Sequence, residues 1–313
     1  MKGVILVENS FVHPYMPNSV PENKKVMLDE LGINSVEDIY KSIIPDELLY
    51  KERLDIPEPI RSEYELKRHV MGILNRDITT EEYTSFLGAG CYKHQVPAIC
   101  DEINSRGEFL TAYCGDTYSD HGKMQAIFEY TSMMGELLDT DVVSYTTYDG
   151  GQAVASSLRM AVRAVREKGM AGKVILVPKT MNPEIYSQVV QYCRNVAEVR
   201  KIAYEPETGL MDLEELKEQL AKKNVAAVFF ENPTYLGNFE TRGEEIAKLA
   251  HDAGAYCVVQ TEVAALGIME SPVNQGADIV CGDIQPLGMH IQFGGGQAGF
   301  IACNQNMDLV EQF

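Results

Sequence analysis

The chain has 313 residues, and its 27 lysines and arginines against 46 aspartates and glutamates give a formal net charge of −19. This length suits one large domain with an appendage, or two domains, and the hydrophobic fraction of 45% excludes wholesale disorder. The negative charge opposes binding to nucleic acid and to anionic membranes, which carry the same sign, so we expect neither as a partner.

The cysteines and the N-terminal residues indicate in which cellular compartment the protein is expected. The seven cysteines stand singly with no CxxC pair, so they indicate neither a disulfide framework nor a metal site, and we expect reduced, half-buried thiols. The apolar run Val4–Val7 is too short for a signal-peptide core or a membrane span. We therefore expect a cytoplasmic protein. The cysteines are Cys91, Cys100, Cys114, Cys193, Cys257, Cys281 and Cys303.

Residues 13 to about 85 are predicted to form an N-terminal arm of short helices. Prolines interrupt it repeatedly, and proline lacks an N–H and clashes inside a helix. One helix is predicted over Pro21–Leu31 and closed by Gly32, and Ser35 and Ser62 are predicted to cap two more. Such an arm has little continuous core, so we expect it to wrap another surface of the same chain or of a partner.

From Lys123 onward, helical patterns alternate with apolar, β-branched runs. Continuous apolar strands separated by helices are typical of a parallel sheet that helices cover on both faces. The sequence therefore predicts an α/β fold, with Gly254 ending the last of these helices. Helices are predicted over 123–138, 151–168, 183–195, 212–223 and 242–253, and strands over 173–177, 225–230, 256–259 and 277–281.

The C-terminal residues continue this pattern. Gly299–Cys303 is predicted to be a strand, and Met307 begins a further helical pattern. The sequence ends at Phe313, part-way through that pattern. Because large α/β domains of this kind usually continue, we expect a final domain to be missing from the chain.

Two glycine clusters raise the question of a nucleotide or cofactor site. Gly294–Gly299 contains GxGxxG, but strand-like residues follow it, whereas a dinucleotide fingerprint requires a helix there. We therefore favour a tight turn, or a loop that lets another backbone or a ligand approach closely. Phe86–Gly90 carries a similar but weaker indication of close backbone packing.

Gly150 and Gly151 open a helical pattern. Free backbone amides at a helix start, with the positive end of the helix dipole, form a cradle for an anion. The alternative is an ordinary helix start capped by Asp149. The spacing favours the cap, because Asp149 would repel a phosphate, but both interpretations stay open.

His121 lies in the polar segment Thr111–Gly122, between carboxylates, and could act as a metal ligand or a general base. No second histidine stands at helical spacing, so a solvated loop histidine is the favoured interpretation. His94 and Cys91 lie near each other without a triad pattern. A metal-dependent hydrolase built on His94 and His121 is therefore only a minor alternative.

Segments spread over nearly the whole chain carry a resemblance to a known family. They are His13–Ser19, Ser62–Leu66, Phe86–Tyr92, Val96–Ala98, Thr111–Tyr113, Gln125–Glu129, Tyr148–Gly151, Pro178–Thr180, Gly276–Val280 and Phe293–Gly295. Together they resemble the first subunit of the two-subunit glycine dehydrogenase (decarboxylating), the P-protein of the glycine cleavage system. The resemblance implies an N-terminal arm over 1–85 and, over 86–313, the large domain of a fold-type I pyridoxal phosphate (PLP) enzyme, with the small C-terminal domain missing.

The resemblance also points to two residues that this chain lacks. A fold-type I site needs a lysine for the Schiff base and an aspartate that keeps the pyridinium nitrogen protonated. Near the places expected for them stand Gln285 and Gln260. We therefore expect no catalytic residue and no covalently bound PLP here. The residues expected to form an interface surface or a vestigial cofactor cradle are Tyr148, Asp149, Gly150, Gly151, Gly294, Gly295 and Gly296.

The function that the resemblance implies is that of a subunit without PLP, inactive alone, in a glycine decarboxylase heteromer. Its partners would be a PLP-bearing second subunit and a lipoyl carrier protein, and its substrate glycine or a related amine. One departure keeps an alternative open, since Cys114–Met124 replaces the sequence usual in the family. The chain could instead partner a PLP subunit that acts on another amine, or be a scaffold or regulatory subunit.

Overall fold

The computed structural model describes residues 12–50, 52, 54–86, 93–110, 121–291 and 297–313. By its internal contacts the chain divides into two units, Met1–Asp77 and Ile78–Phe313, which are described separately. The division falls before residue 85, where the sequence predicted the end of the N-terminal arm. No helix among the described residues is long and apolar enough to cross a lipid bilayer.

The first unit is helical and has the caps that the sequence predicted. Gly32 ends the first long helix in the left-handed conformation, which glycine adopts without steric cost. The amide of Ser35 donates to the Asp38 carboxylate at 3.1 Å, and the Ser62 hydroxyl accepts from the amide of Glu65. The elements are η1 (Pro17–Ser19), α1 (Pro21–Leu31), α2 (Val36–Ile43) and α3 (Glu63–Leu74), and none contains a buried residue.

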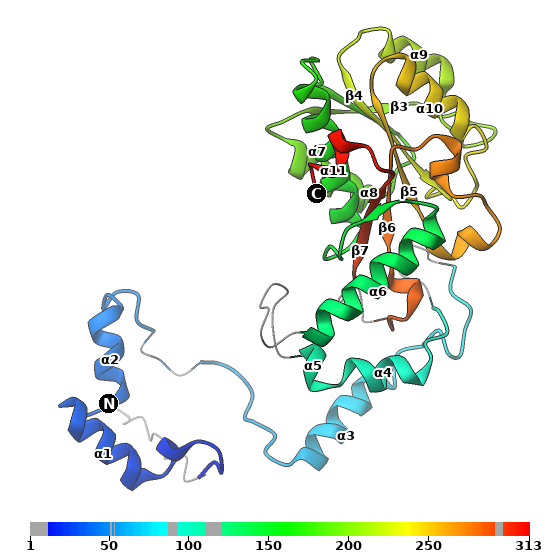
Figure 1. The fold of residues 1–313 in the computed structure, drawn as a ribbon. Helices are drawn as coiled ribbons and strands as arrows, with labels where there is room; N and C mark the ends of the chain where they lie inside the picture. Colours follow the sequence, from blue (N-terminus) through cyan, green and yellow to red (C-terminus); the bar gives the residue numbers. More distant parts are fainter. Residues whose placement is uncertain (1–11, 51, 53, 87–92, 111–120, 292–296) are drawn as a thin grey trace. The chain divides into compact units, whose positions relative to one another are not determined.

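The second unit is built on one seven-stranded sheet (Figure 1). Its strands are β1 (Val142–Val143), β2 (Val174–Pro178), β3 (Glu198–Ile202), β4 (Val225–Asn232), β5 (Tyr256–Thr261), β6 (Ile279–Asp283) and β7 (Gly299–Cys303). They follow the order β1-β7-β6-β5-β4-β2-β3. Strands β3 to β6 and β2 run parallel, whereas β7 is antiparallel to both β6 and β1.

Three helices of the second unit precede β1 in the chain, four lie between strands, and one follows β7. They are α4 (Ala98–Asn104), α5 (Gly107–Leu110), α6 (His121–Leu138), α7 (Gly150–Glu167), α8 (Pro183–Cys193), α9 (Leu213–Leu220), α10 (Gly243–Asp252) and α11 (Met307–Val310). Short 3₁₀ turns are η2 (Val263–Gly267), η3 (Pro272–Gln275) and η4 (Gln285–Leu287). After α10, Gly254 adopts φ 76°, as expected of a residue that ends a helix.

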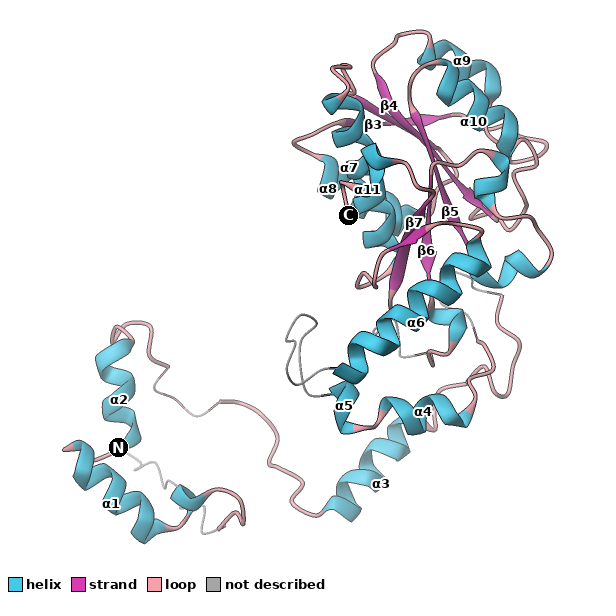
Figure 2. Ribbon diagram, in the orientation of Figure 1, coloured by secondary structure: helices cyan, strands magenta, loops and turns pink. Residues whose placement is uncertain are grey.

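Helices cover the sheet on both faces (Figure 2). On one face α7, α8 and α11 pack against residues such as Ala227 and Phe229, and on the other α6, α9 and α10 pack against Val228 and Phe230. Successive side chains of a strand point to opposite faces, so a strand buried on both must be apolar throughout. This is why the apolar runs located the central strands correctly, and the predicted α/β class is confirmed.

The structure also corrects the prediction in detail. The helices and strands predicted over 123–281 are all present, with bounds that differ by at most three residues. Strand β3 was missed because, at the edge of the sheet, it carries charged residues, and β1 was missed because it has two residues. The helix that begins at Met307 ends at Val310, so it is not still under way at Phe313.

Candidate functional site

A cavity of about 570 Å³ opens at the carboxyl ends of the parallel strands β4, β5 and β6, beside the start of α7. In open α/β sheets, ligands bind in the crevice at this edge. Its polar lining residues are Asp149, Asn182, Glu184, Gln188, Glu231, Thr234, Tyr235, Gln260, Thr261, Glu262, Asp283 and Gln297, together with Gly150 and Gly151. We call this cavity the strand-end pocket.

The start of α7 is capped by carboxylates. Asp149 Oδ1 accepts from the amide of Gln152 at 2.6 Å, so Asp149 is the N-cap that the spacing favoured. The amide of Gly150 donates to Asp283 Oδ2 at 3.1 Å, across 133 residues of sequence. The amides at this helix start therefore already hold two carboxylates of the chain itself.

Three glycines pack closely against neighbouring atoms around the start of α7. A Cβ on Gly150 would lie 3.0 Å from Asp283 Cβ, and a Cβ on Gly151 would lie 2.4 Å from Gln188 Oε1. A Cβ on Gly299 would lie 2.3 Å from the carbonyl oxygen of Asp149. Gly299 thus has the close-packing role that we favoured for its cluster, and Gly294, Gly295 and Gly296 lie outside the described residues.

Three carboxylates of the pocket lie at the ends of strands. Glu231 is only 5% exposed and both of its oxygens accept from the amide of Asn182, while burial raises its pKa to about 7. Burial also raises the pKa of Glu262 and of Asp283. Among the described residues that line the pocket there is no lysine, arginine or histidine, so no cation compensates these carboxylates.

Sequence reasoning did not identify Glu231, Glu262 and Asp283. The signal was present, because each lies at or directly after the carboxyl end of a central strand, and the carboxyl ends of parallel strands meet at one edge of a sheet.

The two glutamines predicted at cofactor positions have different environments. Gln260 lines the pocket, and its Oε1 atom is buried without a hydrogen-bond partner among the described residues. Gln285 is 1% exposed and does not line the pocket. Its side-chain amide donates to the carbonyl of Met289, and its backbone amide donates to Asp283 Oδ1 at 2.7 Å. Gln285 therefore helps to hold Asp283.

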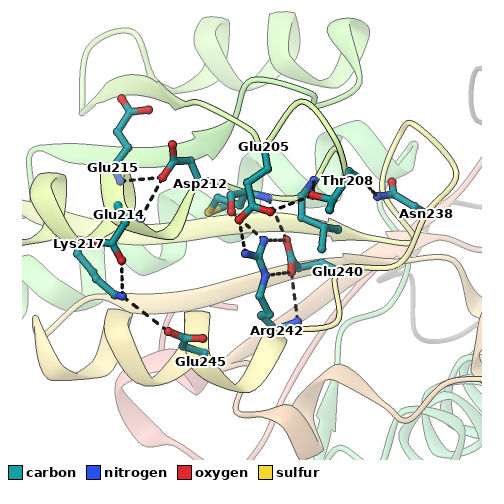
Figure 3. Close-up of polar contacts among 12 residues, drawn as sticks. Glu205, Thr208, Asp212, Glu214, Glu215, Lys217, Asn238, Glu240, Arg242 and Glu245 are labelled. Carbon is teal, nitrogen blue, oxygen red and sulfur yellow. Dashed lines mark hydrogen bonds and ion pairs between the residues drawn. The ribbon is translucent and has the colours of Figure 1, made fainter.

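The loop that follows β4 contributes Thr234 and Tyr235 to the pocket. A network of charged side chains holds this loop in place (Figure 3). Glu240 is buried, and its carboxylate accepts from Arg242 Nε at 3.0 Å and from the amide of Met211 at 3.0 Å. Arg242 also pairs with Glu205 at 2.7 Å. The network ties the loop after β4 to the loop before α9.

Other candidate residues are not in the pocket. Tyr148 is 85% exposed and lines a separate groove of about 950 Å³ with Tyr145 and Arg159. His121 begins α6, but its side chain and residues 111–120 lie outside the described residues, as do 87–92. Over the part of the chain that is described, no group of three histidine, cysteine, aspartate or glutamate side chains could hold a metal ion.

The strand-end pocket does not fit PLP. PLP needs a lysine for its aldehyde, a carboxylate beside its pyridine nitrogen and backbone amides free to bind its phosphate. Here Gln260 offers a neutral amide, no lysine lines the described pocket, and the amide of Gly150 already holds Asp283. The surrounding carboxylates would also repel a phosphate.

Comparison with known proteins gives matches over nearly the whole chain. The profile of the family described as "Glycine cleavage system P-protein" matches residues 13–310. The "Probable glycine dehydrogenase (decarboxylating) subunit 1" of Pyrococcus horikoshii is 38% identical over 300 residues, or 95% of this chain and 64% of the relative. The protein of the same name from Staphylothermus marinus is 35% identical over 311 residues, or 96% and 64%. The chain thus spans less than two thirds of these relatives.

Comparison with solved structures gives the same family. The crystal structure of a glycine decarboxylase (P-protein) of the glycine cleavage system, in inhibitor-bound form, matches with a TM-score of 0.76 and 32% identity over 94% of this chain and 63% of that chain. This match confirms the predicted fold class, the large domain of a fold-type I enzyme. A sphingosine-1-phosphate lyase of Burkholderia pseudomallei, with a TM-score of 0.60 and 13% identity over 86% of this chain and 64% of that chain, shares the fold alone.

Proposed function

The chain belongs to the glycine cleavage system P-protein family, and from that premise we propose that it is the subunit of a two-subunit glycine decarboxylase that does not carry PLP. The composition of the strand-end pocket is the observation that supports this proposal. The pocket stands where the fold binds its ligands, yet its described lining offers carboxylates and amides in place of a lysine and a phosphate cradle. Decarboxylation would therefore take place on a partner chain.

The partner in this proposal is a second subunit that holds PLP. Two observations support a two-chain assembly. The relatives are named as subunit 1 of an enzyme, and the helices of the first unit contain no buried residue. Helices that bury no side chain gain little stability by themselves, so a further surface, of a partner or of the second unit, would stabilise them. We propose that the first unit is covered in the assembled enzyme.

The remaining components follow from the family. A lipoyl carrier protein would accept the aminomethyl group, and glycine would be the amine substrate. We further propose that the complex acts in the cytoplasm, where thiols stay reduced; the five described cysteines are all free. They are Cys100, Cys193, Cys257, Cys281 and Cys303.

Co-expression with the PLP-bearing subunit of the same organism tests the proposal. We expect the two chains to co-purify, and the complex to exchange CO₂ with the carboxyl group of glycine, while this chain alone shows neither activity nor PLP absorbance. After borohydride reduction, mass spectrometry should find the pyridoxyl group on the partner. A pyridoxyl-lysine on this chain would contradict the proposal. Exchange with another amino acid, but not with glycine, would favour the alternative in which the PLP-bearing partner acts on another amine.

A further inference from the structure

Asp283 stands at the position where the fold would hold an anion. Its Oδ2 accepts from the amide of Gly150, the first residue of α7, and its Oδ1 accepts from the amide of Gln285, the first residue of η4. Each oxygen therefore receives a backbone N–H at the start of a helical segment. Such N–H groups, together with the positive end of an 18-residue helix, are the groups that bind phosphate in other proteins.

Asp283 lies directly against the start of α7, and its carboxylate takes up the amide of Gly150. A Cβ on Gly150 would meet Asp283 Cβ at 3.0 Å and the Asp283 nitrogen at 3.1 Å, so the two backbones are in direct contact. The next residue, Gly151, lies against the side chain of Gln188. Asp149 covers a third amide, that of Gln152. A phosphate would have to displace the Asp283 carboxylate to reach the amide of Gly150.

The charges in the pocket also oppose the binding of a phosphate. Asp149 and Glu262 both line the pocket with Asp283, and no cationic side chain stands among the described lining residues. Burial raises the pKa of Asp283, the two amides lower it, and Asp149 raises it further. The carboxylate is thus retained in the pocket by its two amide donors and not by an ion pair.

We propose that Asp283 determines ligand specificity in this pocket, by occupying the anion position at the start of α7 and so excluding phosphate-bearing ligands. The inference goes beyond the proposed function, because it names a single side chain as the cause of exclusion. A pocket that merely lacks the lysine could still bind a phosphorylated ligand without a covalent bond; a pocket whose anion position is filled could not.

Phosphate titration of the full chain tests this inference. The probes are inorganic phosphate and pyridoxamine phosphate, which has no aldehyde to react with surface lysines, and the readouts are calorimetry and the shift of the melting temperature. Asp283→Ala should bind phosphate about tenfold more tightly than the unmodified chain, since it frees two amides and removes a like charge. Asp283→Asn keeps an acceptor at the site and serves if Asp283→Ala does not fold; it should show a smaller gain.

Glu262→Gln is the matched control, because it removes a carboxylate from the same pocket without freeing an amide of α7. It should bind phosphate no better than the unmodified chain. Equal gains in Glu262→Gln and Asp283→Ala would overturn the inference in favour of a general charge effect. Phosphate binding by the unmodified chain as tight as that of folded Asp283→Ala, or no gain in folded Asp283→Asn and Asp283→Ala, would also overturn it. The titration uses this chain alone, so its failure leaves the subunit proposal standing, and the co-purification result leaves this inference untouched.

Discussion

Both carboxylate oxygens of Glu231 accept from the backbone amide of Asn182, at 3.2 and 3.3 Å. The contact ties the end of β4 to the start of α8, at the base of the strand-end pocket. A carboxyl group buried in this way, with no cation among the described lining residues, favours its neutral form. The pocket therefore contains a group that changes its charge near neutral pH.

Stability should consequently depend on the protonation of Glu231. Burial raises its pKa from 4.5 to about 7, so the native chain keeps a proton that the unfolded chain has already released. The free energy of unfolding should therefore fall as the pH rises from about 4.5 to about 7, by up to about 3 kcal/mol from this group. Glu231→Gln should remove this part of the fall, and be more stable than the unmodified chain at pH 8.

Urea denaturation across this pH range is the measurement. Glu214→Gln, which changes an exposed glutamate on α9, is the control and should keep the pH dependence of the unmodified chain. Curves for Glu231→Gln and the unmodified chain that stay parallel from pH 4.5 to 8 would show that Glu231 is not the titrating group.

Gly282 should tolerate no side chain. A Cβ there would lie 2.3 Å from the carbonyl oxygen of Thr261 and 2.9 Å from the ring of Phe300, both within the sheet. Relieving the overlap requires β5 or β7 to move, so Gly282→Ala should lower the free energy of unfolding by about 3 kcal/mol. Thermal or urea unfolding measures this, with Gly267→Ala as the control, since nothing lies within 4 Å of a Cβ at Gly267. Equal stabilities of the two variants would refute the steric argument.

Arg242 should matter more than other cations in the same region. Glu240 is 3% exposed and depends on Arg242 for its ion pair, so Arg242→Ala should lower the free energy of unfolding by about 3 kcal/mol through the uncompensated buried charge. Lys217→Ala removes an exposed ion pair with Glu214 and should cost less than about 1 kcal/mol (Figure 3).

The comparison should be made by urea denaturation of both variants. Because the network holds the loop that bears Tyr235, Arg242→Ala should also increase proteolytic cleavage in that loop, whereas Lys217→Ala should not. A cost for Arg242→Ala no larger than that for Lys217→Ala would contradict the role assigned to the network.

The central sheet could be predicted because burial on both faces demands apolar residues throughout, as in Val225–Phe230. The edge strand β3 could not, since it has a neighbouring strand on one side only and three of its five residues, Glu198, Arg200 and Lys201, are charged. The caps were predictable for a different reason. Asp149 and Ser62 accept from amides three residues away, and Asp38 accepts from the amide of Ser35 three residues before it, so the signal is local.

The pocket was predictable only in part. Asp149, Gly150 and Gly151 were identified from a local pattern, and Gln260 from the family resemblance, as the residue near the place expected for the PLP aspartate. The pairing of Gly150 with Asp283 was not, because it depends on how two distant strands and a helix pack and leaves no local trace. Gln285 lies in the expected stretch, yet the turn η4 directs it toward Met289 and away from the pocket.

The sheet order also constrains the order in which the chain can fold during synthesis. Strand β1 is made first, but its neighbour in the sheet is β7, the last strand in the described part of the chain. Until Gly299–Cys303 leaves the ribosome, β1 has no strand to pair with and one edge of β6 stays open. The central strands can pair earlier, so the nascent chain would expose an unpaired strand edge, a target for chaperones, until synthesis passes Cys303.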